Sequence, residues 1–287
     1  MTVTAVTSVR VDARGQTDVG LRRKANEDHF VIMTLSKAAE IRQTSLPDPE
    51  AFQALRGPEG WLFIVADGVG GQPGGELASQ TAIAALVKYI GQAAACFNNL
   101  DTDKEHEVLE QLEAAVHDAH RRISEEHGGG GGARKRDAVP GPATTLTMAM
   151  LIWPRAYLVH VGDSRAFYLR RNRLRQLTRD QTTGEFMVDS GVWTEEQARK
   201  APISGTLVSA LGADEMTPSV GLVDLQPGDT LLLCTDGLTR HLPDERIAEL
   251  LGGAGDAESA CRELVAAALA GGGHDNVTVV AARMVPS

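Results

Sequence analysis

The chain has 287 residues, of which 43% are hydrophobic and 23% charged, and this is an ordinary globular composition, long enough to bury a large core. Its formal net charge of -10 argues against nucleic acid as the main partner. No apolar run approaches the roughly 18 to 20 residues that span a bilayer, which argues against a membrane protein.

The N-terminus and the cysteines favour a reducing compartment. The first residues lack the basic and apolar regions of a secretory signal, and Cys96, Cys234 and Cys261 are scattered and odd in number. We interpret the cysteines as buried thiols. A cytoplasmic location, without a membrane anchor, is expected.

Hydrophobic periodicity predicts strands followed by two long helices in the first half of the chain. The strands are expected at 9–13, 30–33 and 61–66, and the helices at 76–90 and 104–127. Glycines 128–132 end the second helix, and an exposed loop follows at 133–142. Further strands are then expected at 146–152, 157–161 and 166–169, with Asn172 in the next turn.

The second half begins with a polar, irregular stretch from about 180 to 212, with short helices at 185–190 and 195–200. We predict that this stretch is a surface subdomain inserted between strands. Strands at 220–223 and 230–234, helices at 243–251 and 257–270, and a strand at 277–282 follow. Because regular βαβ alternation is absent, the fold class is expected to be α+β, with antiparallel sheets packed together and helix pairs outside.

Short acidic motifs recur where strands are expected to meet loops. Buried carboxylates repel one another and resist ionisation unless cations neutralise them. Hard oxygen ligands without Cys or His indicate magnesium or manganese rather than zinc. The motifs are Asn26-Glu27-Asp28, Asp67-Gly68, Asp236-Gly237 and Asp275-Asn276.

Each motif has a simpler interpretation when taken alone. The stretch from Asp67 to Gly71 is equally consistent with a tight turn in which the Asp caps a helix, and Asp163 with a hairpin turn. A dinucleotide-binding glycine pattern fails because Pro73 stands where glycine is needed, and no phosphate-binding P-loop pattern occurs. The serines lack the setting of a hydrolase nucleophile.

Several basic residues could contribute to a site. Arg23, near the first acidic motif, could bind a phosphate bidentately, or form a surface ion pair. His117 and His120 lie at helical spacing and could bind metal, but we favour a solvent-facing position. The basic residues 134–136 could form a docking patch, but a solvated loop is favoured.

Together, the motifs resemble the metal-dependent protein phosphatases of type 2C in their bacterial form. The opening signature, D-x-G-x-x-R-x-x-N-E-D, is matched in full from Asp18 to Asp28. The later signatures are matched in order over nearly the whole chain, from about residue 8 to 283. They are Ala66 to Gly71, Thr144-Thr145-Leu146, Val161 to Arg165, Thr235 to Leu238, and Asp275 to Thr278.

The resemblance implies one catalytic domain over 1–287, a four-layer α-β-β-α sandwich with a flap-like subdomain at about 180–212. It implies two Mn²⁺ or Mg²⁺ ions in a cleft and a weaker third ion. Asp67 would bridge the two ions, the Gly68 carbonyl would bind one, and Arg23 would bind the phosphoryl group. Of the remaining ligands, Asp236 and Asp275 would complete the pair, Asp163 would share the third ion with Asp236, and Glu27 and Asp28 would act through water.

The resemblance also implies the reaction. Two divalent ions would lower the pKa of a bridging water, which would attack phosphorus in line without a phosphoenzyme. The expected substrates are phosphoserine and phosphothreonine on proteins, including a bacterial serine/threonine kinase or its targets, and the expected state is a monomer. Regulation would then come from partners, metal supply or expression.

The sequence departs from the family pattern at the flap and beside Asp67. Val69 stands where some eukaryotic relatives carry a His, so the resemblance implies that a metal-bound water would protonate the leaving group. Gln181 replaces a common His, and residues 203–206 replace a more polar stretch, which puts specificity borne by the flap in doubt.

Two alternative functions are left open. The client could be an anti-sigma-factor antagonist or a secretion-system component. The chain could also be a degenerate phosphatase that only binds phosphoproteins.

Overall fold

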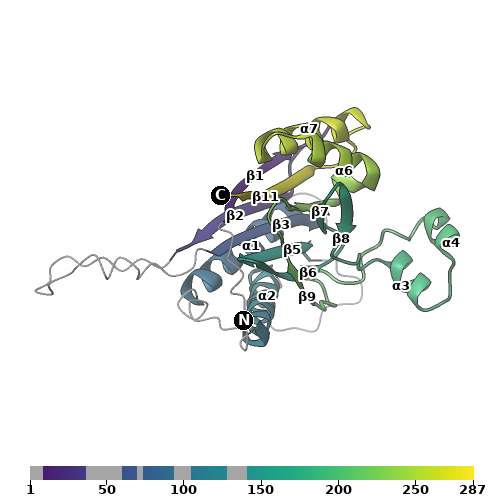
Figure 1. Ribbon diagram of the computed structural model, residues 1–287. Helices are drawn as coiled ribbons and strands as arrows, with labels where there is room; N and C mark the ends of the chain where they lie inside the picture. Colours follow the sequence, from purple (N-terminus) through teal and green to yellow (C-terminus); the bar gives the residue numbers. More distant parts are fainter. Residues whose placement is uncertain (1–8, 37–59, 70–73, 94–104, 128–140) are drawn as a thin grey trace, which may run out of the picture.

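A computed structural model describes residues 9–36, 60–69, 74–93, 105–127 and 141–287. Two antiparallel sheets form its centre (Figure 1). The five-stranded sheet has the order β1 (Val9–Asp18), β11 (Val277–Pro286), β10 (Thr230–Cys234), β7 (Arg165–Arg170) and β8 (Arg173–Gln176). The six-stranded sheet has the order β2 (Asp28–Leu35), β3 (Gly60–Val69), β5 (Leu146–Ile152), β6 (Arg155–Val161) and β9 (Ser219–Asp224), with β4 (Ala143–Thr144) paired to β3.

Helices cover the outer face of each sheet. One core cluster joins the six-stranded sheet to α1 (Gly74–Ala93) and α2 (Glu105–His127). A second joins the five-stranded sheet to α6 (Asp244–Gly253) and α7 (Ala257–Ala270), and a third lies between the sheets. The expected α+β class and the four-layer sandwich are confirmed.

Strand periodicity explains how β3 serves two of these layers. Alternate side chains of a strand point to opposite faces. Leu62 and Ile64 therefore pack against the helices, whereas Phe63 and Val65 pack against the other sheet, and all of them are fully buried. A strand buried on both faces reads as a continuous apolar run, as residues 61–66 do.

Helix α7 shows how the sequence starts and orients an outer helix. The Asp256 carboxylate accepts a hydrogen bond from the backbone N–H of Ser259 at 2.7 Å, which caps the first turn. Ala260, Leu264 and Ala268 then recur four residues apart and are buried against the five-stranded sheet.

Several boundaries differ from the expectation. Asp67 and Gly68 lie inside β3 rather than beyond it, because Asp67 is paired with Asp28 of β2 and Gly68 with Thr144 of β4. Strand β8 and the short helix α5 (Asp236–Thr239) were not predicted as elements, since four residues carry too little periodicity.

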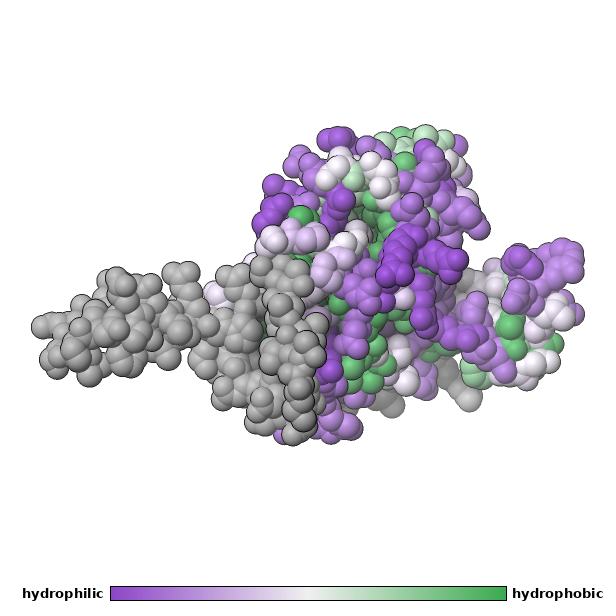
Figure 2. Space-filling model, viewed as in Figure 1, coloured by the Kyte–Doolittle hydropathy of each residue, from purple (hydrophilic) through white to green (hydrophobic). Residues whose placement is uncertain are grey.

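The stretch predicted as a flap-like subdomain carries α3 (Thr183–Asp189) and α4 (Glu195–Lys200), which project from the two-sheet body (Figure 1). Figure 2 shows hydrophobic surface on this projection, and the exposed apolar residues in the stretch are Phe186, Val192, Ile203 and Val208. Its boundaries at about 180–212, within one domain over 1–287, stay a prediction.

Cys234 and Cys261 are buried free thiols, as expected, whereas Cys96 lies outside the described residues. Glycines 128–132 and the basic residues 134–136 also lie outside them. In the described part of the chain, no helix is long and apolar enough to cross a membrane.

Candidate functional site

The acidic motifs converge on one cleft at the ends of the central strands. A cavity of about 800 Å³ opens there, bordered on one side by residues 205–210 from the end of the projecting stretch. Its charged lining combines carboxylates from both sheets with two guanidinium groups. These residues are Glu27, Asp67, Asp163, Asp236 and Asp275, with Arg23 and Arg240.

Asp28 and Asp67 lie directly opposite each other on β2 and β3. The pKa of Asp28 is raised to about 7, chiefly by burial and also by the charges of Asp236 and Asp275, while hydrogen bonds from Thr278 and Thr235 oppose the rise. The pKa of Asp67 is raised well above its usual value by burial and then by the charge of Asp28. These carboxylates therefore carry an uncompensated electrostatic cost.

Asp236 and Asp163 form the other side of the cleft. Asp236 is the first residue of α5, and Asp163 lies in the turn between β6 and β7. The pKa of Asp163 is raised to about 7, chiefly by burial and also by the charge of Asp236, while Arg240 opposes the rise. Burial also raises the pKa of Asp236, and Arg240 again opposes the shift.

The backbone around Asp67 is held from two sides. Its N–H donates to the Thr145 hydroxyl at 3.0 Å, and its carbonyl accepts from the Thr144 hydroxyl at 2.9 Å. The next N–H, of Gly68, donates to the Glu27 carbonyl at 3.2 Å. A Cβ on Gly68 would collide with the carbonyl oxygen of Gly75, so this close approach requires glycine.

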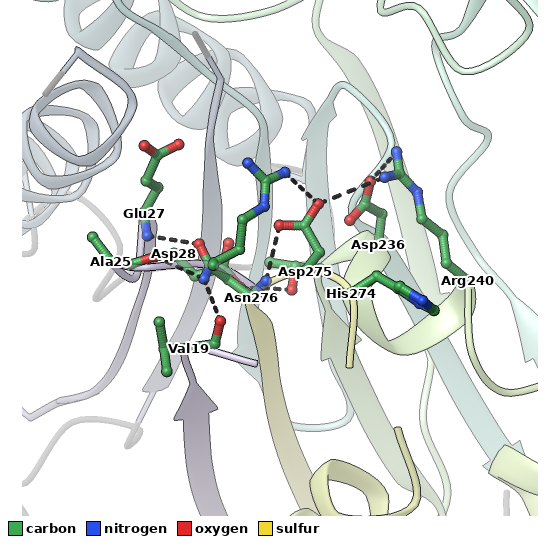
Figure 3. A network of polar contacts seen from close by, with 12 residues as sticks. Val19, Ala25, Glu27, Asp28, Asp236, Arg240, His274, Asp275 and Asn276 are labelled. Atoms are coloured by element: carbon green, nitrogen blue, oxygen red, sulfur yellow. Dashed lines mark hydrogen bonds and ion pairs between the residues drawn. The ribbon is translucent and has the colours of Figure 1, made fainter. Parts of the chain in front are cut away.

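Asn276 joins the first acidic motif to the last (Figure 3). Its Oδ1 accepts from the Glu27 N–H at 2.8 Å, and its Nδ2 donates to the carbonyls of Val19 at 2.9 Å and Ala25 at 3.0 Å. Its own N–H donates to Asp275 at 2.9 Å. The sequence marked Asn276 as part of a motif but did not show this role, because its partners lie about 250 positions away.

Arg23 reaches the cleft beside Asp275. Its Nη2 donates to Asp275 Oδ2 at 2.7 Å, and half of the side chain is exposed. The hydrogen bond with Asp275 raises the pKa of Arg23, so the guanidinium stays charged. The ion pair that the sequence offered as an alternative for Arg23 is thus present, with Asp275 as the partner. The same guanidinium lines the cavity, where it can also bind an anion.

The site fits hard divalent cations in the type of its oxygen atoms, which are carboxylates gathered at one cavity. Asp28 Oδ1 and Asp236 Oδ1 are buried and find no hydrogen-bond partner among the described residues, which is costly for carboxylate oxygens. Within the described ranges, no three His, Cys, Asp or Glu side chains are already grouped closely enough to hold an ion. Arg23 and Arg240 instead pair with Asp275 and Asp236, so each of these two carboxylates has one oxygen, Oδ2, already engaged by a guanidinium.

Other polar residues singled out in the sequence have structural partners. His117 is exposed, as favoured, but the expectation for His120 was wrong, since its Nδ1 accepts from the Gly212 N–H at 3.1 Å. Gln181 holds the turn before Asp163, because its Oε1 accepts from the Gly162 N–H at 2.9 Å. Its Nε2 donates to the Thr217 carbonyl at 3.0 Å.

The raised pKa of Asp163 predicts a pH dependence of the metal-free protein. The pKa of Asp163 is about 7 in the folded protein and 3.8 ordinarily. The contribution of Asp163 to the free energy of unfolding is therefore complete below pH 3.8 and is lost as the pH rises through 7. In EDTA, the urea midpoint of the wild type should therefore fall more between about pH 5.5 and 8 than that of Asp163→Asn.

Burial lowers the pKa of His160 to about 4, so the contribution of His160 to stability increases as the pH rises, opposite to that of Asp163. Because both proteins contain His160, its contribution cancels in the comparison. The control is Asp189→Asn, which removes an exposed carboxylate from α3. Equal pH slopes for the wild type and Asp163→Asn would contradict the prediction.

The family profile described as Protein phosphatase 2C matches residues 39–269. The matched range contains Asp67, Asp163 and Asp236, whereas Arg23 and Asp275 lie outside it.

The serine/threonine protein phosphatase PstP of Mycobacterium tuberculosis is 39% identical over 225 residues, which are 78% of this chain. The chain spans 40% of the length of that curated relative.

Two solved structures are also similar. The serine/threonine phosphatase of S. agalactiae gives a TM-score of 0.75 at 25% identity, over 96% of this chain and 100% of that one. The catalytic domain of PstP in complex with two manganese ions gives a TM-score of 0.69 at 31% identity, over 97% and 100%.

Proposed function

The chain belongs to the protein phosphatase 2C family, and on that premise we propose that it hydrolyses phosphoserine and phosphothreonine on proteins in a metal-dependent reaction. The observation that carries the proposal is the convergence of carboxylates from both sheets on one cavity. Two buried carboxylate oxygens there have no hydrogen-bond partner in the described part of the chain, and Arg23 lines the same cavity. A purely structural cluster of this kind would be unfavourable.

Four positions would hold a pair of divalent ions: Asp67, the Gly68 carbonyl, Asp236 and Asp275. A solved relative binds two manganese ions, which supports manganese or magnesium as the cofactor class. When bound, such ions supply positive charge for the phosphoryl oxygens and lower the pKa of a water nucleophile. Glu27 and Asp28 would act through water.

Arg23 would hold the substrate's phosphoryl group in this cleft. A guanidinium can donate two parallel hydrogen bonds to phosphate oxygens, which fixes orientation as well as charge. Its ion pair with Asp275 keeps it at the cavity in the absence of substrate. Val69 also lines the cavity and offers no proton, so the leaving group would take its proton from water.

Metal removal tests this proposal directly. We expect phosphate release from a phosphothreonine peptide with Mn²⁺ or Mg²⁺, and its loss in EDTA, because the carboxylate cluster cannot activate water without neutralising cations. Readdition of metal should restore release. Folded protein that binds the peptide but releases no phosphate with either metal would instead support a phosphoprotein-binding module.

Arg23→Ala should raise KM for the phosphopeptide about tenfold with little change in kcat, because it removes a phosphate contact and no metal ligand. Steady-state kinetics at saturating Mn²⁺ measure this split. Arg22→Ala, an adjacent exposed arginine, serves as the control. A KM equal to that of the wild type would exclude Arg23 from phosphate binding.

The biological setting forms part of the same proposal. The clients would be phosphoproteins, including a serine/threonine kinase or its targets, and the protein would act in the cytoplasm as a monomer. The similarity to PstP supports the substrate class at the level of phosphorylated protein side chains.

A further inference from the structure

Arg240 introduces a fixed positive charge among the proposed metal ligands (Figure 3). It caps α5, and its backbone N–H donates to the Asp236 carbonyl at 2.9 Å. Its guanidinium contacts Asp236 Oδ2, with Nη2 at 3.9 Å from Asp163 Oδ2 and Nη1 at 3.7 Å from Asp275 Oδ2. One side chain thus faces three carboxylates that come from distant parts of the chain.

We infer that the guanidinium of Arg240 takes the place of a third divalent cation between Asp163 and Asp236, so that the chain binds two ions rather than three. This inference rests on the proposed function, because it concerns the same cleft. It assigns to Arg240 a role in setting the number of ions, which none of the sequence motifs suggested.

The two oxygens of Asp236 differ in what they contact. Its Oδ2 is engaged by Arg240, whereas its Oδ1 is buried and no described residue hydrogen-bonds to it. The carboxylate can therefore give Oδ1 to an ion of the central pair while Oδ2 stays with the guanidinium. A further ion on the Asp163 side would have to displace Arg240 from Oδ2.

Asp163 has Arg240 as its cationic neighbour because the nearer arginine in sequence is engaged elsewhere. Arg165 donates to both oxygens of Asp180 at 2.8 and 2.7 Å. Among the described residues, the cation paired with Asp163 is Arg240, whose Nη2 lies 3.9 Å from Asp163 Oδ2. Gln181 limits the movement of the turn that carries Asp163, because its Oε1 accepts a hydrogen bond from the Gly162 N–H at 2.9 Å.

Tethering favours the guanidinium over a free ion. Arg240 and Asp236 are four residues apart on one helical turn, so their pairing costs no translational entropy. The planar guanidinium group can also face more than one carboxylate. A free ion must lose part of its hydration shell to bind at the same place.

The number of bound Mn²⁺ ions tests the inference. Equilibrium dialysis against Mn²⁺ with metal analysis, supported by calorimetry, should give two ions for the wild type and three for Arg240→Gln. Arg240→Lys, which keeps the charge, should give two, and Arg240→Gln combined with Asp163→Asn should return to two. The control Arg246→Gln removes an exposed arginine paired with Glu249 on α6 and should also give two.

Three ions in the wild type, or two in Arg240→Gln, would overturn the inference. The proposed function would stand in either case if the wild type released phosphate from the phosphothreonine peptide with Mn²⁺. Failure of the wild type to bind Mn²⁺ at all would overturn both. Circular dichroism and urea unfolding would establish that each variant is folded, which is expected because half of the Arg240 side chain is exposed.

Discussion

Asp67→Asn is expected to lower kcat/KM for a phosphothreonine peptide about 1000-fold, equivalent to about 4 kcal/mol of transition-state stabilisation. Asp67 lies opposite Asp28 in the centre of the acidic cleft, where it would contact both ions. Asparagine keeps the shape but removes the charge that attracts divalent cations. Metal-dependent phosphate release, assayed over a range of Mn²⁺ concentrations, measures the effect.

The fold should survive this change. Burial and the charge of Asp28 raise the pKa of Asp67, so a neutral side chain relieves repulsion in the metal-free protein. We therefore expect Asp67→Asn to be at least as stable as the wild type in EDTA. Asp224→Asn, an exposed carboxylate on β9, provides the matched control. Wild-type turnover in Asp67→Asn would refute the metal assignment.

Asn276→Leu is expected to destabilise the metal-free protein by about 3 kcal/mol. The substitution leaves the Glu27 N–H and the carbonyls of Val19 and Ala25 without their partner. Each buried group left unsatisfied costs about 1–3 kcal/mol, and relaxation towards water reduces the sum. Urea unfolding in EDTA measures the change without a contribution from bound metal.

Asn276→Asp separates the two sides of this network. Aspartate keeps the acceptor for Glu27 but loses both donors to the carbonyls of Val19 and Ala25. It should therefore lose stability and also place another charge beside Asp275. If Asn276→Leu unfolded at the same urea concentration as the wild type, Asn276 would not hold the two motifs together.

The sequence predicted those parts of the fold that depend on local periodicity. Strands β5 and β10 and helices α4 and α7 begin and end where expected, because continuous apolar runs or helical spacing mark them. Asp67 was expected beyond the end of its strand, since Asp-Gly favours turns. Pairing with Asp28 and Thr144 overrides that local preference.

The site was predictable as far as motifs could be aligned with a known family, and less so in its contacts. Arg240 lies four residues after Asp236, a spacing that brings side chains together only on a helix. Because α5 has only four residues, hydrophobic periodicity could not predict it from the sequence. The partners of Asn276 could not be found from one sequence, since they depend on pairing between distant strands.

The pairing of β1 with β11 has a consequence for protein synthesis. Strand β11 lies between β1 and β10, with Val9 opposite Pro286 and Asp18 opposite Val277, and Asp275 and Asn276 immediately precede it. A ribosome-bound chain that already exposes the segments of β1 and β10 therefore lacks the strand that lies between them. Since Asp275 and Asn276 directly precede β11, the proposed site cannot be complete before β11 has left the exit tunnel. Such long-range closure is also typical of slow folding.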